Sequence, residues 1–145
     1  MKNIFLDGNI YDQLAIDEAG RGNITKLIKS GALQIIATPV IRNELSASPY
    51  KGIPNWFPVL QRPEAVAIVG EFAVGEAILD DGEVYTKHRG ESTKVRDGII
   101  AQSAHTFTDI FVTNDKRCRK RFQQIKGNCI AMDYAGFLMW LKSEV

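Results

Sequence analysis

The sequence predicts a three-layer α/β fold in which a parallel sheet carries helices on both faces. Short continuous apolar runs alternate with longer amphipathic stretches, the order expected of strands joined by helices. The chain has 145 residues, the size of one domain with a sizeable core, and no repeat or linker divides it. Its composition, 45% hydrophobic and 24% charged, is that of an ordinary soluble globular protein. We therefore expect a single domain over residues 1–145.

Glycine and proline mark most element boundaries in the first part of the chain. Gly20 and Gly22 are expected to interrupt a helical stretch, and Gly31 fits the position just past a helix end. Thr38 is expected to cap a helix, because Pro39 follows at a position that proline favours. The predicted elements, in order, are a strand over residues 4–6, a helix over 10–19, a helix over 23–29, a strand over 33–37 and a helix from Pro39.

The rest of the chain continues the alternation after one irregular stretch. Prolines recur from Pro49 to Pro63, with Trp56 between them, and this pattern predicts a loop held down by aromatic side chains. The elements expected after it are a helix over 64–79, a helix from Ser92 or Thr93, a strand over 110–113, a short basic helix after Asp115, a strand over 129–131 and a helix over 134–141.

Four acidic residues stand in apolar surroundings at the ends of predicted strands or on helices beside them. These are Asp7, Glu44, Asp97 and Asp115. Glu44 follows Val40 by four residues, which places it on the buried face of its helix. A carboxylate beside a buried strand is costly unless a cation meets it. Because ligands of open parallel sheets bind beyond the carboxyl ends of the strands, these acids predict a Mg²⁺ or Mn²⁺ site and phosphodiester chemistry.

Each acid also has a purely structural interpretation. Asp7 can cap a helix, Asp97 can stabilise the positive end of one, and Asp115 can belong to a turn. Glu44 can form a surface ion pair with Arg42 or Lys51. Their joint occurrence favours a common site. For Asp133, at the end of the last predicted strand, helix capping is the default, and a fifth acid at the same rim is the alternative.

A basic segment follows Asp115 directly. The net charge is −2 over residues 1–80 (7 basic, 9 acidic) and +3 over residues 81–145 (11 basic, 8 acidic). This segment is either a solvated helix or a surface that binds RNA phosphates beside the metal site, and Lys87-His88-Arg89 and Lys94-Arg96 can extend it. Its basic residues are Lys116, Arg117, Arg119, Lys120 and Arg121.

Several other function classes lack support in the sequence. No apolar run is long enough to span a bilayer and the N-terminus does not resemble a secretory signal, so we expect a cytoplasmic protein with no membrane partner. Cys118 and Cys129 are expected to be free thiols in the core. His88 and His105 have no metal-ligand spacing, and there is no P-loop or serine–histidine arrangement. Tyr11, Tyr50 and Trp56 are expected to pack internally rather than stack on bases.

The four acidic segments together resemble the PIN-domain ribonucleases, the family that includes the VapC-type toxins of toxin–antitoxin pairs. The matching segments are FLDGNIY, VIRNELS, RDGIIAQSA and VTNDKR, which span nearly the whole chain in the family's order. The resemblance implies an α/β/α sandwich with a mainly parallel sheet, the four acids as the Mg²⁺ or Mn²⁺ site, and endonucleolytic cleavage of RNA. It also implies that Asn9 and Thr113 or Asn114 support the acids by hydrogen bonds. Gly8 stands where the family usually has Thr or Ser.

The leading hypothesis is a metal-dependent endoribonuclease in which Asp7, Asp97 and Asp115 hold the metal and Glu44 is a ligand or base. The resemblance implies an antitoxin partner whose Arg or Lys reaches the carboxylates, and a homodimer is plausible. The alternative is a non-catalytic module of the same fold that binds RNA or a partner protein. A third possibility, phosphoryl transfer on a small substrate, is disfavoured because a haloacid-type phosphatase needs a second Asp where Asn9 stands.

Overall fold

The computed structural model of the protein describes residues 1–63, 89–125 and 127–145. Within these residues it contains a five-stranded sheet and six helices. The strands are β1 (Lys2–Leu6), β2 (Leu33–Ala37), β3 (Val59–Gln61), β4 (Ile110–Val112) and β5 (Ile130–Met132). The helices are α1 (Gly8–Ala15), α2 (Glu18–Lys29), α3 (Pro39–Ser46), α7 (Arg89–Phe107), α8 (Lys116–Gln124) and α9 (Tyr134–Glu144).

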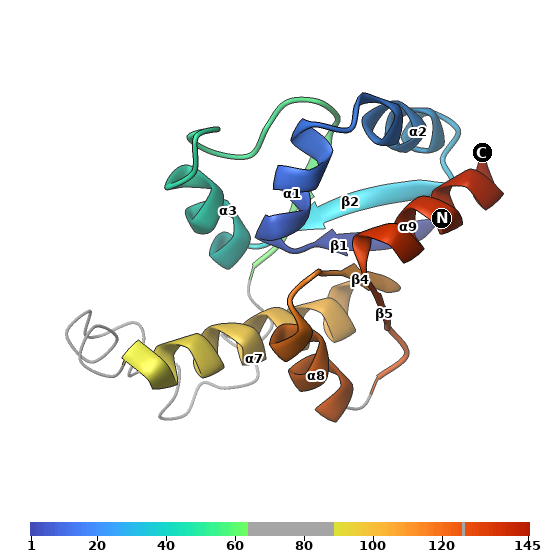
Figure 1. Ribbon diagram of the computed structural model, residues 1–145. Helices are drawn as coiled ribbons and strands as arrows, with labels where there is room; N and C mark the ends of the chain where they lie inside the picture. The colour runs from blue at the N-terminus through green and yellow to red at the C-terminus, as the bar shows by residue number, and fades with distance from the viewer. Residues whose placement is uncertain (64–88, 126) are drawn as a thin grey trace.

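All strand pairs are parallel, and the order in the sheet is β3-β2-β1-β4-β5. The chain therefore starts in the centre, builds one half outward through β2 to β3, and then returns to add β4 and β5 on the other side of β1. Helices α1 and α2 lie on one side of the sheet and α7 and α8 on the other (Figure 1), while α9 packs on α2. The predicted α/β/α sandwich with a parallel sheet is confirmed.

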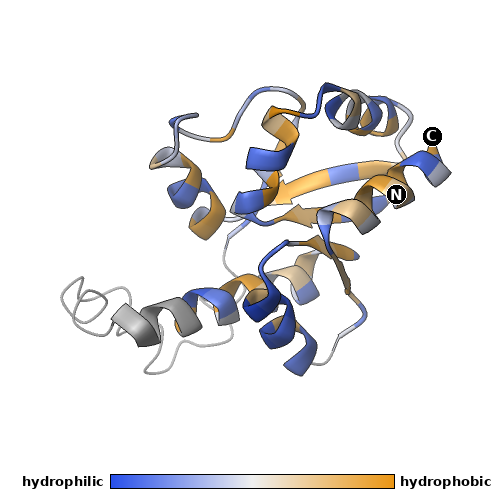
Figure 2. Ribbon diagram, in the orientation of Figure 1, coloured by the Kyte–Doolittle hydropathy of each residue, from blue (hydrophilic) through white to orange (hydrophobic). Residues whose placement is uncertain are grey.

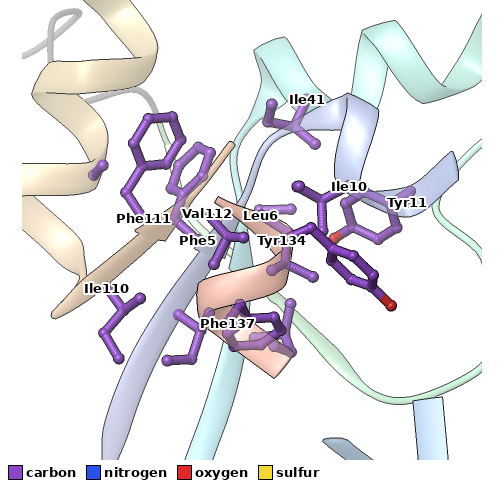
Figure 3. Close-up of a cluster of buried hydrophobic side chains, with 14 of the residues drawn as sticks. Phe5, Leu6, Ile10, Tyr11, Ile41, Ile110, Phe111, Val112, Tyr134 and Phe137 are labelled. Atoms are coloured by element: carbon purple, nitrogen blue, oxygen red, sulfur yellow. The ribbon is translucent and has the colours of Figure 1, made fainter. Parts of the chain in front are cut away.

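The central strands are apolar because helices cover them on both faces. Ile4, Phe5 and Leu6 of β1 are fully buried, and Phe5 meets Phe111 of β4 edge to face at 5.7 Å between ring centroids. Figure 3 shows these rings beside each other, with Tyr134 and Phe137 of α9 lying near Leu6. The strands are correspondingly the most hydrophobic part of the ribbon (Figure 2). This core fixes the strand ends from which the site is built.

The predicted boundary between the first two helices is wrong. Helix α1 ends at Ala15, and α2 runs from Glu18 straight through Gly20 and Gly22. The break comes at Asp17, whose carboxylate accepts a hydrogen bond from the Gly20 N–H at 2.9 Å and caps α2. A Cβ on Gly20 would lie 2.7 Å from Oδ2 of the capping Asp17 and 3.0 Å from the Tyr134 oxygen. The Asp17 cap and the packing of Tyr134 therefore both favour glycine at this position inside the helix.

Three further expectations need correction or fall outside the structure. The stretch from Pro49 to Pro63 is not entirely irregular, because its residues 59–61 form β3 on β2. Helix α7 begins at Arg89, earlier than predicted, so Asp97 lies in its middle rather than in its early turns. The helix predicted over 64–79 lies outside the described residues. No helix in the described part of the chain is long and apolar enough to span a membrane.

Candidate functional site

The carboxyl ends of β1 and β4 form the point where the sheet changes direction. The two strands are neighbours although they are far apart in sequence, and Leu6 pairs with Val112. The Asp7 N–H continues the ladder by donating to the Val112 carbonyl at 2.9 Å. In open α/β sheets this position is where ligands bind, because the connections on its two sides leave in opposite directions. Asp7 and Thr113, one residue past each strand, meet here.

Asp7 is held by three donors. Its Oδ2 accepts hydrogen bonds from the Thr113 hydroxyl at 2.7 Å and, more weakly, from the Asn9 amide at 3.4 Å. Its Oδ1 accepts from the Gly8 N–H at 2.8 Å, so Asp7 also caps α1. The side chain is only 3% exposed. Asp7 is thus a buried carboxylate with a fixed orientation, and the capping role anticipated from the sequence coexists with its place at the rim.

Asp97 is the second buried carboxylate. It projects from the middle of α7, and its side chain is 3% exposed. Burial raises the pKa of Asp97 above its ordinary value. The charge of Arg96 opposes this shift, while the charges of Asp115 and Asp7 add to it. Two other carboxylates therefore lie near enough to Asp97 to act on its charge.

Glu44 reaches the site from α3 but is not buried, contrary to the helix-face prediction. Its side chain is 38% exposed and lies over the start of α1. A Cβ on Gly8 would come within 2.5 Å of a Glu44 carboxylate oxygen, so this carboxylate fills the space that a side chain at position 8 would take. Partial burial raises the pKa of Glu44, Arg96 opposes this, and Asp7 reinforces it.

Asp115 follows β4 and caps α8. Its Oδ1 accepts from the N–H groups of Arg117 at 2.9 Å and Cys118 at 3.2 Å. Its own N–H donates to the Thr113 hydroxyl at 3.1 Å. The predicted turn is therefore a helix N-terminus, and Thr113 connects Asp115 to Asp7 through a single hydroxyl. The structure thus positions these two acids relative to each other.

The buried Cys118 thiol lies near three of the acids. Burial raises its pKa well above the ordinary value, and the charges of Asp7, Asp97 and Asp115 each add to the effect. Three of the four predicted site residues therefore lie close enough to Cys118 for their charges to act on the pKa of its thiol. As predicted, Cys118 and Cys129 are free and buried.

The residue that sequence reasoning missed is Arg96, which the sequence indicates only as a possible extension of the phosphate-binding segment. Its guanidinium lies 3.6 Å from Asp7 Oδ1 and 3.3 Å from Asp97 Oδ1, and it also donates to Glu44 Oε2. These are the three ion pairs found among the described residues. Neighbours in a helix do not ordinarily face one another, so the pairing of Arg96 with Asp97 had no sequence signal. Glu44 pairs with Arg96 and not with Arg42, which donates to Gln61.

The polar neighbours of the acids differ in role from one another. Asn9 and Thr113 both donate to Asp7, as the resemblance implied. Asn114 instead supports the frame: its N–H donates to Asn9 Oδ1 at 3.3 Å, and its own Oδ1 accepts from the Tyr134 N–H at 2.9 Å. These bonds tie the loop after β4 to α1 and to the start of α9.

The basic segment forms α8, the most hydrophilic helix in Figure 2. Lys116, Arg117 and Lys120 are exposed. Arg119 and Arg121 are half-buried; Arg119 donates to the Thr113 carbonyl at 3.4 Å, and the charge of Arg121 acts on Asp97. The helix therefore begins beside Asp115, and its basic side chains extend from the acidic site along its length. Lys87 and His88 lie outside the described residues, as do the side chains of Arg89 and Lys94.

The remaining candidates have structural roles. Asp133 is exposed and caps α9 by accepting from the Gly136 N–H at 2.8 Å. His105 stacks on Phe122 at 4.0 Å between ring centroids. Tyr11 is fully buried, and Trp56 packs against Tyr50, as expected.

The donor set suits a hard divalent cation, because it consists of carboxylate oxygens with fixed second partners. Among the residues that the structure describes, however, no three His, Cys, Asp or Glu side chains are arranged to hold a metal ion as they stand. The guanidinium of Arg96, instead, lies against three of the four carboxylates. The chemistry of the donor set therefore fits a divalent cation, and both the guanidinium and the carboxylates would have to shift for the acids to share one. Comparison of the chain with models of protein families, with curated proteins and with solved structures finds no match.

Proposed function

We propose that the protein is a metal-dependent endoribonuclease that hydrolyses RNA phosphodiester bonds. The observation that carries the proposal is the meeting of Asp7, Glu44 and Asp97 on one guanidinium at the carboxyl ends of β1 and β4. Asp115 joins them through Thr113 and through its effect on Asp97. Four acids from four separate segments have no need to converge for folding alone, because like charges destabilise one another in a poorly hydrated site.

Asp7, Asp97 and Asp115 are the residues that would hold Mg²⁺ or Mn²⁺. Such an ion would supply Lewis-acid stabilisation of a phosphate and would lower the pKa of a bound water. Asp7 and Asp97 are both buried, and three hydrogen bonds orient Asp7. Glu44 is the exposed member, and its raised pKa suits a group that accepts a proton from water and passes it to solvent.

Helix α8 supports RNA as the substrate class. Lys116, Arg117 and Lys120 project into solvent from the helix that Asp115 caps, so a phosphate chain that crosses the acidic site meets them next. Arg119 and Arg121 lie closer to the acids and would contact phosphates beside the scissile one. The likeness of the four acidic segments to PIN-domain ribonucleases favours RNA in the same way and extends the proposal to a toxin neutralised by an antitoxin.

The test is cleavage of a labelled single-stranded RNA by purified protein with Mn²⁺, with Mg²⁺ and with EDTA. We expect cleavage with either metal, 5′-phosphate product ends and no cleavage in EDTA. Asp7→Asn, purified in parallel, is expected to be inactive because it removes a charge from the acidic site while retaining its size. Equal cleavage by both proteins, or cleavage that persists in EDTA, would reject the proposal.

A second candidate function is a non-catalytic module that binds RNA or a partner protein. Arg96 favours it, because this side chain already neutralises the acids without a metal. Such a module would bind RNA through α8 equally well with Mg²⁺ and with EDTA. Binding that is insensitive to metal, together with failure to cleave a pool of random-sequence RNA, would select this candidate over the first.

A further inference from the structure

We infer that Arg96 is an internal counter-ion of the acidic site, and that a divalent cation binds there by displacing its guanidinium. The inference rests on the proposed function, because it treats Asp7, Glu44 and Asp97 as ligands of that cation. It adds a property that the proposed function does not contain: cation binding is an exchange of one positive group for another.

The contacts of Arg96 place one positive charge among three carboxylates of three different helices or their caps. Its Nη2 lies 3.6 Å from Asp7 Oδ1 and donates to Glu44 Oε2, and its Nη1 lies 3.3 Å from Asp97 Oδ1. A planar guanidinium can serve several carboxylates at once, which a rounded ammonium group does less well. These contacts hold together acids that would otherwise repel one another in the metal-free protein.

The oxygen atoms that Arg96 contacts are those that a cation would need. Asp7 Oδ2 is already held by the Thr113 hydroxyl at 2.7 Å and the Asn9 amide at 3.4 Å. Oδ1 accepts a single hydrogen bond, from the Gly8 N–H, and it is this oxygen that faces Arg96. A cation and the guanidinium would therefore compete for the same lone pairs. Simultaneous occupation would also bring two positive groups into close contact.

The side chain of Arg96 can leave without disturbing the core. It is 25% exposed, and its neighbour Glu44 is 38% exposed, so the path outward leads to solvent. Asp7 and Asp97 are 3% exposed each, and Asp7 is held by hydrogen bonds from Gly8, Asn9 and Thr113. A long charged side chain at such a rim can move its head group into water while its stem stays in contact with the protein. Arg96 can therefore move its guanidinium out of the site and into water.

The test compares Mn²⁺ binding by the wild type and Arg96→Gln, measured by isothermal titration calorimetry. We expect the variant to bind Mn²⁺ about tenfold more tightly, because no guanidinium has to be displaced. The metal-free variant is expected to melt at a lower temperature than the wild type. Saturating Mn²⁺ is expected to raise the melting temperature of the variant by more than it raises that of the wild type. Arg121→Gln is the matched control, since it removes the same charge near Asp97 from a residue that makes none of the ion pairs described.

A second measurement is made on the wild type, and a variant serves only to assign the signal. In the wild type, the side-chain Nε–H signal of Arg96 in a ¹⁵N NMR spectrum is expected to shift in proportion to Mg²⁺ occupancy. Arg96→Lys assigns that signal by its loss. A signal that stays unchanged at saturating Mg²⁺ would overturn the inference, because the guanidinium would then remain in place.

The outcomes separate this inference from the proposed function. Equal Mn²⁺ affinity of the wild type and Arg96→Gln, or an equal gain in Arg121→Gln, would overturn the displacement of Arg96 and leave the metal site standing. A complete lack of Mn²⁺ and Mg²⁺ binding in both proteins would overturn the displacement and the proposed function together. Tighter binding confined to Arg96→Gln, with a shifted Nε–H signal in the wild type, would support the inference.

Discussion

Asp97→Asn is expected to lower RNA cleavage by at least about 100-fold without lowering the free energy of unfolding of the metal-free protein. The activity falls because the variant removes a buried cation ligand. Stability holds because burial and the neighbouring acids raise the pKa of Asp97 in the folded state. Because its pKa is raised in the folded state, Asp97 keeps a proton in the folded protein at pH values where it has lost it in the unfolded protein. The free energy of unfolding therefore falls as pH rises from the ordinary pKa of an aspartate to the raised pKa of Asp97. Asparagine carries no such charge.

The measurement pairs cleavage rates with urea unfolding in EDTA at several pH values. We expect the unfolding free energy of Asp97→Asn to match or exceed that of the wild type at neutral pH, and the difference to shrink in acid. Asp109→Asn is the control, because Asp109 lies at the amino end of β4 and accepts a hydrogen bond from the Asn3 N–H at 2.8 Å. It is expected to retain full activity. A clear loss of stability in Asp97→Asn, with activity retained, would mean that Asp97 has a structural role.

Thr113→Val is expected to affect stability and activity together. The Thr113 hydroxyl is fully buried, donates to Asp7 Oδ2 at 2.7 Å and accepts from the Asp115 N–H at 3.1 Å. Valine has nearly the same shape but leaves both partners without this bond, which is expected to cost about 1–3 kcal/mol of unfolding free energy. Because Asp7 and Asp115 then lose their common support, Mn²⁺ affinity and cleavage are expected to fall roughly 10–100-fold.

Thr113→Ser separates the hydroxyl from the rest of the side chain. It keeps both hydrogen bonds and loses only a methyl group, so its Mn²⁺ affinity is expected to stay close to that of the wild type. Calorimetric titration with Mn²⁺ and thermal unfolding of the two variants provide the comparison. If serine and valine weaken metal binding equally, packing at position 113 matters rather than the hydroxyl, and the proposed support of the two acids is wrong.

The sheet was predictable where the strands carry their own signal. β1, β2 and β4 each contain an apolar run, over residues 4–6, 35–37 and 110–112, since helices cover both faces of these strands. β3 was missed, because its three residues Val59–Gln61 lie among prolines and become a strand only through pairing with β2, where Val59 aligns with Ile35. An edge strand of this length takes its conformation from its neighbour, and its own sequence has no period to reveal it.

The sequence by itself determined which acids stand near the strand ends. Asp7 directly follows an apolar run and Asp115 closely follows another, and parallel strands bring their carboxyl ends to one edge of the sheet. Only the tertiary structure decided which positive group neutralises the charges of these acids. Arg96 lies 52 residues from Glu44 in sequence and meets it across the rim between α3 and α7. Local patterns report which face of an element is apolar, whereas the partner of a charge depends on how separate elements pack.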